Sequence, residues 1–225
     1  MNKKNSTLVI LAAVMVCTMV IAGTLAYLKT ATEAPVKNTF VAADGLINPN
    51  PTTDPTPTDP YDNNGLFVLE HEISVTTDGS YEIADKADIA LGNDYRVLPG
   101  VKLPKDPFVR INGKNDIPAY LYIEVVDTLG KDSGLTYSIS NSWLKLDGVT
   151  GEKGGQIYVY ASGSNAIMVK EDVTDVAILS GNGITVADKL NIAENAELTF
   201  YAYLGQASAG KTATEVFTNC FAAKD

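Results

Sequence analysis

The feature of this sequence that most limits its fold is a two-residue alternation of apolar side chains with polar or aromatic ones. In residues 119–126 one face carries Leu121, Ile123 and Val125, with Tyr120, Tyr122 and Glu124 on the other face. In residues 198–204 the apolar face carries Leu198, Phe200, Ala202 and Leu204. Residues 156–160 alternate in the same way, and residues 66–75 set on one side Phe67, Leu69, Ile73 and Val75. Because successive side chains of a strand point to opposite faces, a single apolar face predicts half-buried antiparallel strands.

Turn-forming residues separate these strands. Glycine-containing turn signals, two of them Asn-Gly, occur at residues 98–100, 111–113 and 181–183, with the spacing typical of a sandwich or a jelly roll. A helix is indicated only for residues 212–221, and it is short. The sequence therefore predicts an all-β fold for residues 66–225, an antiparallel jelly-roll-like β-sandwich with a short C-terminal helix.

The faces opposite the apolar ones are rich in tyrosine. The tyrosines expected to point outward are Tyr120, Tyr122, Tyr158, Tyr160, Tyr201 and Tyr203. Exposed aromatic side chains are favoured at contacts between subunits. They also suit solvent-facing strand positions and pair across strands without any partner protein, and we favour this second interpretation.

The chain begins with a short basic segment that leads into an uncharged stretch, residues 8–26. This order is typical of a secretory signal peptide, which we expect to form an N-terminal helix over residues 1–27. The small side chains of Thr24 and Ala26 fit a signal-peptidase site, so cleavage is expected after Ala26 or Tyr27. The apolar stretch is also long enough to span a bilayer. A retained anchor is therefore the alternative, and it would be the only contact with a membrane.

Export places the protein in the extracellular space or at the cell surface, and the composition agrees with this location. Beyond the signal segment the chain has one cysteine, Cys220, so no intramolecular disulfide can form and the core must hold the fold. The chain carries 17 basic and 27 acidic residues, for a net charge of -10. An acidic surface repels nucleic acid and anionic lipid, so we expect no nucleic-acid partner.

A proline-rich segment divides the mature chain. Five of the ten prolines lie between Pro49 and Pro60, where they exclude a sheet interior and favour an extended chain. Residues 48–65 are therefore expected to form a linker or an exposed loop. This segment follows a mature N-terminal segment, residues 28–47, and precedes the β-sandwich domain.

One stretch has the letter pattern of a nucleotide site. Residues Gly205 to Thr212 match the P-loop consensus, which binds phosphates through backbone N–H groups and a lysine, here Lys211. A P-loop also needs a parallel strand that supplies an acid for Mg²⁺, and only residues 213–225 follow. We therefore predict that the glycines make a turn between a strand and a helix, and that the chain binds no nucleotide.

The single histidine limits metal and hydrolase chemistry. His71 lies among the apolar residues of a predicted strand, and we interpret it as a half-buried strand histidine. One imidazole cannot build a two-histidine zinc motif and leaves no spare for a Ser-His-Asp triad. Residues 62–65 are similar to part of an EF-hand loop, but Pro60 stands at its first ligand position and His71 at its twelfth. The sequence therefore predicts neither an enzyme nor a bound metal or other cofactor.

The signal-peptide junction resembles that of a family of exported proteins. Residues 23–28 (Gly-Thr-Leu-Ala-Tyr-Leu), followed by residues 36–41 (Val-Lys-Asn-Thr-Phe-Val), are similar to the export junction of TasA, camelysin and related Gram-positive proteins processed by the signal peptidase SipW. The segments that look like the clostridial pilin-like branch of that family are residues 95–100, 105–107, 119–125 and 198–203.

The resemblance implies a jelly-roll sandwich that is exported to build biofilm-matrix or surface fibres. In such families the mature N-terminus acts as a donor strand that completes the sheet of the next subunit, a strand-addition mode of binding. The donor residues carried over are Val36, Asn38, Thr39, Phe40 and Val41. The implied partners are other copies of the chain or homologous subunits, and the signal peptidase during export. The proline-rich insert departs from the family pattern. The metalloprotease activity attributed to camelysin is not carried over, because the chain has no His-Glu-x-x-His.

The sequence leaves functions of different classes open. The first is a structural fibre subunit that assembles without covalent links. The second is a monomeric surface-binding module with the proline-rich segment as its stalk, and a surface hydrolase is a third. The fibre hypothesis assumes that residues 36–41 have few partners in their own chain. A protein beginning at Gly45 is then expected to stay folded and monomeric.

Overall fold

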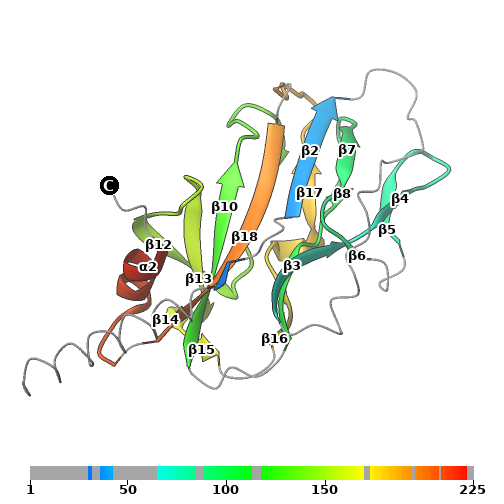
Figure 1. Cartoon of the computed structure of the whole chain (residues 1–225). Helices are drawn as coiled ribbons and strands as arrows, with labels where there is room; N and C mark the ends of the chain where they lie inside the picture. Colours follow the sequence, from blue (N-terminus) through cyan, green and yellow to red (C-terminus); the bar gives the residue numbers. More distant parts are fainter. Residues whose placement is uncertain are drawn as a thin grey trace, which may run out of the picture.

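The computed structural model describes residues 30–31, 36–42, 65–84, 89–112, 118–169, 173–193, 196–207 and 209–221. The predicted signal segment, with its cleavage site at Ala26 and Tyr27, lies outside these residues, as does the proline-rich segment apart from Gly65. The described chain consists mostly of strands, with one short α-helix near the C-terminus (Figure 1). The prediction of an all-β fold with a short C-terminal helix is confirmed.

The largest sheet has nine strands. Its main path, from neighbour to neighbour, is β12 (Trp143–Thr150), β13 (Gln156–Ser162), β10 (Ala119–Asp127), β18 (Ala196–Gln206), β2 (Val36–Ala42) and β7 (Asp94–Val97). Three two-residue strands pair with β18, β13 and β10 respectively: β1 (Thr30–Ala31), β14 (Asn165–Ala166) and β15 (Met168–Val169). The pairing is antiparallel throughout this sheet except between β2 and β7, which run parallel. The predicted antiparallel pairing is thus found in this sheet, with the β2–β7 ladder as its one exception.

Three smaller sheets complete the fold. The four-stranded sheet has the order β16 (Val173–Ala177), β9 (Phe108–Asn112), β3 (Gly65–His71) and β6 (Ile89–Ala90). The three-stranded sheet has the order β11 (Leu135–Thr136), β17 (Gly183–Val186) and β8 (Leu103–Pro104). A hairpin joins β4 (Ile73–Val75) to β5 (Tyr81–Ile83). The helical elements are the 3-10 turn η1 (Ser180–Asn182) and the helix α2 (Ala213–Phe221).

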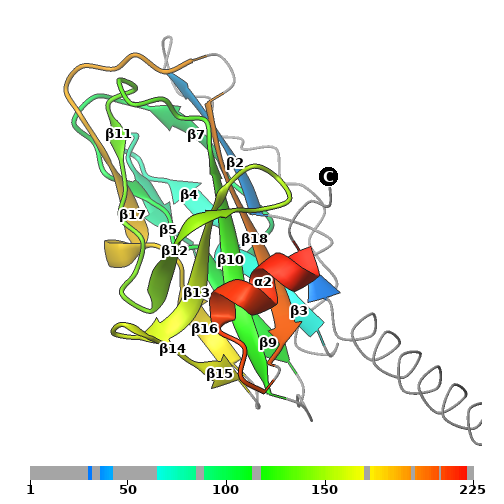
Figure 2. The ribbon, with the colours of Figure 1, turned by 90° about the vertical axis from the view of Figure 1, so that its left-hand side faces the viewer.

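The main core lies between the nine-stranded sheet and the smaller sheets. One cluster of buried side chains joins Leu121 and Phe200 of the large sheet to Val68 and Val109 of the four-stranded sheet and to Ile184 of the three-stranded sheet. None of these five is more than 1% exposed. Figure 2 shows the large sheet and the smaller sheets on either side of this core. The arrangement is sandwich-like, and burial of apolar surface between the layers stabilises it.

The helix α2 packs on the outer face of the large sheet. The helix was predicted, but the strand pattern did not indicate that it covers this face. Phe217 lies 5.1 Å from the ring of Tyr122, and Phe221 lies 5.1 Å from the ring of Tyr203, measured between ring centroids. Tyr122 and Tyr203 are buried. The expectation that they point to solvent is therefore wrong, because a C-terminal helix with an apolar face packs over them (Figure 2). The tyrosines that are half-buried instead are Tyr120, Tyr158, Tyr160 and Tyr201.

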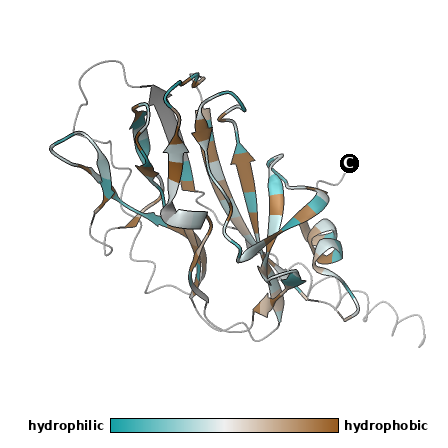
Figure 3. Cartoon of the chain, turned by 180° about the vertical axis from the view of Figure 1, so that it is seen from behind, coloured by the Kyte–Doolittle hydropathy of each residue, from teal (hydrophilic) through white to brown (hydrophobic). Residues whose placement is uncertain are grey.

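The face assignment predicted for residues 66–75 is also wrong. Val68 belongs to the main core, whereas Leu69 packs with Ile89 and Phe108 in a separate cluster on the other side of the strand. The strand is therefore buried on both faces, and its predicted continuation belongs to the β4–β5 hairpin instead. Hydrophobic and hydrophilic residues alternate along the strands of the large sheet, as Figure 3 shows.

Candidate functional site

The strand that carries the predicted donor residues is β2, and it lies inside the chain's own large sheet. It runs between β18 and β7, with Val36 opposite Phe200 and Phe40 opposite Ala196 on the β18 side. On the β7 side the parallel register places Phe40 beside Tyr95. Asn38, Thr39 and Val41 belong to the same ladders, opposite Leu198, Glu197 and Arg96 respectively. Valine, threonine and phenylalanine favour this extended conformation.

The start of β2 is bound tightly to its neighbours. Val36 is fully buried in the main core. Lys37 forms an ion pair with Glu197, with 2.9 Å between Nζ and Oε1, and the hydrogen bond and charge of Glu197 raise the pKa of Lys37. The backbone N–H of Lys37 donates to the carbonyl oxygen of Leu91 at 3.1 Å. A Cβ at Gly92 would lie 1.9 Å from the carbonyl oxygen of Lys37, so only glycine allows this close approach.

These contacts correct one expectation. Residues 36–41 do not lack partners in their own chain, because β2 is hydrogen-bonded along both of its edges. Removing the strand would leave β18 and β7 as two unpaired edges with a gap between them, and unpaired edges recruit other strands. Donation of this strand to a neighbouring copy stays a prediction.

The P-loop-like segment is the junction between β18 and α2. Gly205 lies within β18, opposite Tyr120, and Gly210 has a positive φ of 74° that turns the chain towards the helix. The hydroxyl of Thr212 accepts from the backbone N–H of Glu215 at 3.2 Å, and the Glu215 carboxylate accepts from the N–H of Thr212 at 2.8 Å. This is a capping box that starts the helix. Lys211 forms an ion pair with Glu215 at 3.2 Å, and the predicted turn is confirmed.

His71 has the environment predicted for it, at the end of β3. Its side chain is 17% exposed, and its Nδ1 lies 2.6 Å from Oδ2 of Asp106. The backbone N–H of His71 donates to the other oxygen of Asp106 at 3.2 Å. The interpretation as a half-buried strand histidine is confirmed, and Asp106 is a partner that the sequence did not indicate. Among the described residues, no three His, Cys, Asp or Glu side chains are grouped closely enough to hold a metal ion.

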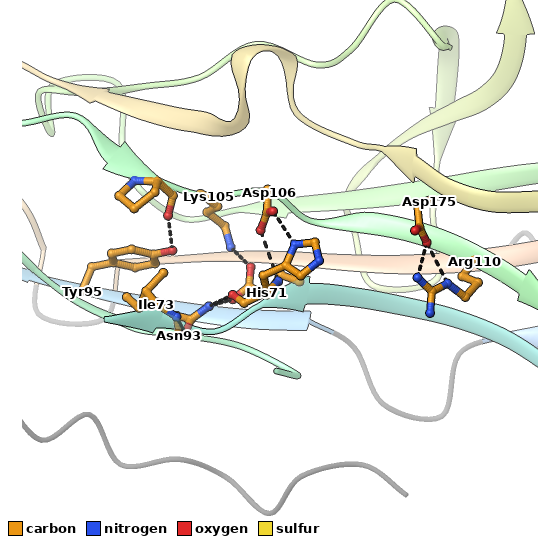
Figure 4. A network of polar contacts seen from close by, with 10 residues as sticks. His71, Ile73, Asn93, Tyr95, Lys105, Asp106, Arg110 and Asp175 are labelled. Carbon is orange, nitrogen blue, oxygen red and sulfur yellow. Dashed lines mark hydrogen bonds and ion pairs between the residues drawn. The ribbon is translucent and has the colours of Figure 1, made fainter. Parts of the chain in front are cut away.

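Beside His71 lies a cluster of buried polar side chains that the sequence did not reveal (Figure 4). Glu70 and Lys105 are paired in the interior, with 2.6 Å between Oε2 and Nζ and side chains that are 1% and 0% exposed. Asn93 donates from Nδ2 to the second oxygen of Glu70 at 2.5 Å. The neighbouring Tyr95 hydroxyl donates to the carbonyl oxygen of Pro104 at 2.7 Å. A correct face assignment for β3 would have indicated that Glu70 is buried, because Glu70 lies on the core-facing side of the strand with Val68.

Burial disfavours the charged forms of Glu70 and Lys105. Desolvation raises the pKa of the Glu70 carboxyl, although the charge and hydrogen bond of Lys105 act in the opposite direction. Desolvation also lowers the pKa of the Lys105 amine against the effect of Glu70. Both shifts favour the neutral pair, because an interior of low polarity penalises each charged form.

A groove with aromatic side chains in its lining lies beside strands β10, β11 and β13. Tyr137, Tyr158 and Asp127 are among the residues that line it. The Tyr137 hydroxyl donates to Asp127 Oδ2 at 2.7 Å. The groove is open to solvent, and it is lined by both polar and aromatic groups.

Comparisons with known proteins add no assignment: no family model, no curated protein and no solved structure matches this chain. The described residues contain no helix long and apolar enough to cross a membrane.

Proposed function

We propose that this protein is an exported structural subunit of a biofilm-matrix or surface fibre, and that copies assemble non-covalently by exchanging β2. In the fibre, β2 of one copy occupies the gap between β18 and β7 of the next. The proposal includes a jelly-roll topology for the sandwich, an extracellular or cell-surface location, and no enzymatic activity. Other copies of the chain or homologous subunits are its partners.

The observation that carries the proposal is the position of β2. The strand fills a gap between two strands of the large sheet, yet residues 43–64 separate it in sequence from β3. At full extension this connection spans at most about 80 Å, which is enough to place β2 in an adjacent subunit. An element that is joined to its domain by a long connection can be exchanged between identical copies at low cost.

The free-energy change of exchange is small because β2 makes the same contacts in its own subunit and in a neighbouring one. In a neighbouring subunit β2 makes the same ladders with β18 and β7, and Val36 fills the same core position. Exchange therefore changes the free energy little per strand, and mass action favours fibres as protein concentration rises. Each subunit of a growing fibre donates one strand and accepts one, which gives a head-to-tail assembly that does not close.

A reversible disulfide tests the exchange. Lys37 and Thr199 are directly opposite each other on β2 and β18, and such pairs have Cα atoms about 4.5 to 5.5 Å apart, within disulfide range. In the mature chain with Cys220→Ser, we expect Lys37→Cys with Thr199→Cys to lock β2 into its own sheet when the monomer is oxidised. Electron microscopy should then show no filaments until a reductant is added. Oxidation of filaments already formed should instead give covalent multimers on a non-reducing gel.

The matched control places the disulfide where β2 is not involved. Ser162 and Asn165 are exposed and opposite each other on β13 and β14, so Ser162→Cys with Asn165→Cys should form filaments in both redox states. Filaments from the fully oxidised Lys37→Cys/Thr199→Cys monomer would overturn strand exchange.

One observation favours the second candidate, a monomeric surface-binding module. Because β2 already completes the chain's own sheet, a single copy has a closed fold. The groove beside Tyr137 and Tyr158 would then be the binding surface. Absence of filaments from the reduced protein at every accessible concentration would favour this candidate.

A further inference from the structure

The buried carboxyl group of Glu70 touches two different nitrogen atoms. Its Oε2 lies 2.6 Å from the amine of Lys105, and its Oε1 lies 2.5 Å from the amide nitrogen of Asn93. An amine and a carboxamide are thus held at the two oxygens of one carboxyl group, as Figure 4 shows. These are the reactants and the proton-transfer group of a transamidation.

The surroundings of the cluster exclude water from the amine. Lys105 is 1% exposed and Asn93 is 9% exposed. The Lys105 Nζ lies 5.6 Å from the ring centroid of Phe200 and 6.0 Å from that of Tyr95. An amine in such a site is readily deprotonated, because burial lowers the pKa of Lys105 while it raises the pKa of Glu70. A neutral lysine amine is a nucleophile.

The carboxamide of Asn93 is oriented and polarised by the backbone of the neighbouring strands. Its Oδ1 accepts from the N–H of Ile73 at 3.3 Å, and its Nδ2 donates to the carbonyl oxygen of His71 at 3.1 Å. These two bonds fix which end of the amide faces Glu70. The Ile73 N–H is aimed at the oxygen on which negative charge develops when the amide carbon is attacked, as an oxyanion-stabilising donor is.

We propose that Lys105 and Asn93 become joined by an autocatalytic isopeptide bond, with Glu70 as the catalytic proton-transfer residue. The neutral Nζ of Lys105 attacks Cγ of Asn93, and the oxyanion on Oδ1 is stabilised by the N–H of Ile73. The attacking nitrogen gives a proton to Oε2 of Glu70, and the proton on Glu70 passes from Oε1 to Nδ2. The Cγ–Nδ2 bond then breaks and one ammonia leaves, so that Glu70 ends in its original state.

The reaction needs one movement and has one structural consequence. The amine and the amide each contact a different oxygen of Glu70, so the Lys105 side chain must turn across the carboxyl group to reach Cγ. The product ties Asn93, which precedes β7 at the edge of the large sheet, to Lys105, which follows β8 of the three-stranded sheet. A covalent link between the two layers would resist their separation under tension.

Peptide mapping by mass spectrometry of the full chain tests this inference. Trypsin cleaves after lysine and arginine, so residues 87–96 and residues 103–110 should be recovered as one branched peptide, with no cleavage after Lys105. Its mass should be the sum of the two peptides less one ammonia. Recovery of residues 87–96, 103–105 and 106–110 as separate peptides, with cleavage after a free Lys105 and an intact Asn93, would overturn the proposal.

Two variants separate this bond from its competitors. Cyclisation of Asn93 onto its own backbone also releases ammonia, but it would persist in Lys105→Met, whereas the isopeptide product must vanish. Glu70→Gln keeps the size of the side chain and removes proton transfer, so it should yield unlinked peptides with cleavage after Lys105. A Glu70→Gln protein that is linked as completely as wild type would exclude the assigned role of Glu70. These assignments do not depend on the proposed fibre, because the link lies within one chain.

Discussion

At the scale of single residues, Glu124 shows how a carboxylate can organise a turn. It lies in β10 and is fully buried. Its Oε1 accepts from the backbone N–H groups of Gly155 at 2.8 Å and Lys153 at 2.9 Å, and its Oε2 accepts from the Tyr203 hydroxyl at 2.6 Å. The turn between β12 and β13 is thereby fixed to the centre of the large sheet. Charge-assisted hydrogen bonds of this kind are stronger than neutral ones.

We expect Glu124→Ala to destabilise the protein by about 3 kcal/mol or more, since each donor left without a partner in the interior costs about 1 to 3 kcal/mol. Urea denaturation followed by circular dichroism measures the change. Glu82→Ala, at an exposed position of β5, is the control and should change stability by no more than about 0.5 kcal/mol. Equal effects of the two substitutions would show that the Glu124 contacts contribute little.

The position of Glu124 also shows what the alternation of residue types could not tell. The pattern in residues 119–126 gave the strand and its core-facing side chains correctly, because a period of two follows from strand geometry alone. It placed Tyr122 and Glu124 on a solvent-facing side. Whether a second face is covered depends on segments distant in sequence, here α2 and the turn at residues 151–155. No local pattern contains that information.

At the scale of secondary-structure elements, residues 205–212 can be interpreted as a P-loop or as the turn and capping box that start α2. The capping box gives Thr212 a structural role, whereas a P-loop would give Lys211 the more important one. We expect Thr212→Ala to lower stability by about 1 kcal/mol. Lys211→Ala should change it by no more than about 0.5 kcal/mol, because an exposed ion pair within one helix turn contributes little. Thermal unfolding compares the two, and isothermal titration should show no saturable ATP binding to wild type. Micromolar ATP affinity that Lys211→Ala abolishes would contradict this assignment.

The wrong face assignment for residues 66–75 has a physical cause. Residues 66–69 are all apolar, so a period of two cannot choose the core-facing side of this strand. The structure divides residues 66–75 between β3 and β4, which pair in different sheets. The buried cluster of Glu70, Asn93 and Lys105 depends on that division. Its three members come from separate segments, so only the tertiary fold brings them together.

At the scale of the whole molecule, β2 determines whether the large sheet is continuous. The strand pattern of residues 36–41 was recognisable in the sequence, but its partners were not, because its ladders connect it to β18 near the other end of the chain. Pairing over such a separation leaves no local signal. The structure therefore changes the expectation for a shortened protein. A chain that lacks β2 should have an open sheet rather than an intact fold.

The last prediction concerns that shortened protein. A chain beginning at Gly45 loses the ladders of β2 and the buried Val36, where each hydrogen bond contributes about 1 kcal/mol and the valine about 1.5 to 3 kcal/mol. We expect its urea midpoint to fall clearly below that of the mature protein, and electron microscopy to show no filaments. A synthetic peptide of residues 28–43 should bind the open groove and restore the midpoint, whereas the same peptide with Val36→Asp should not, because it would place a charge in the core. Filaments from the shortened protein alone, or equal effects of the two peptides, would contradict a fibre built by donation of β2.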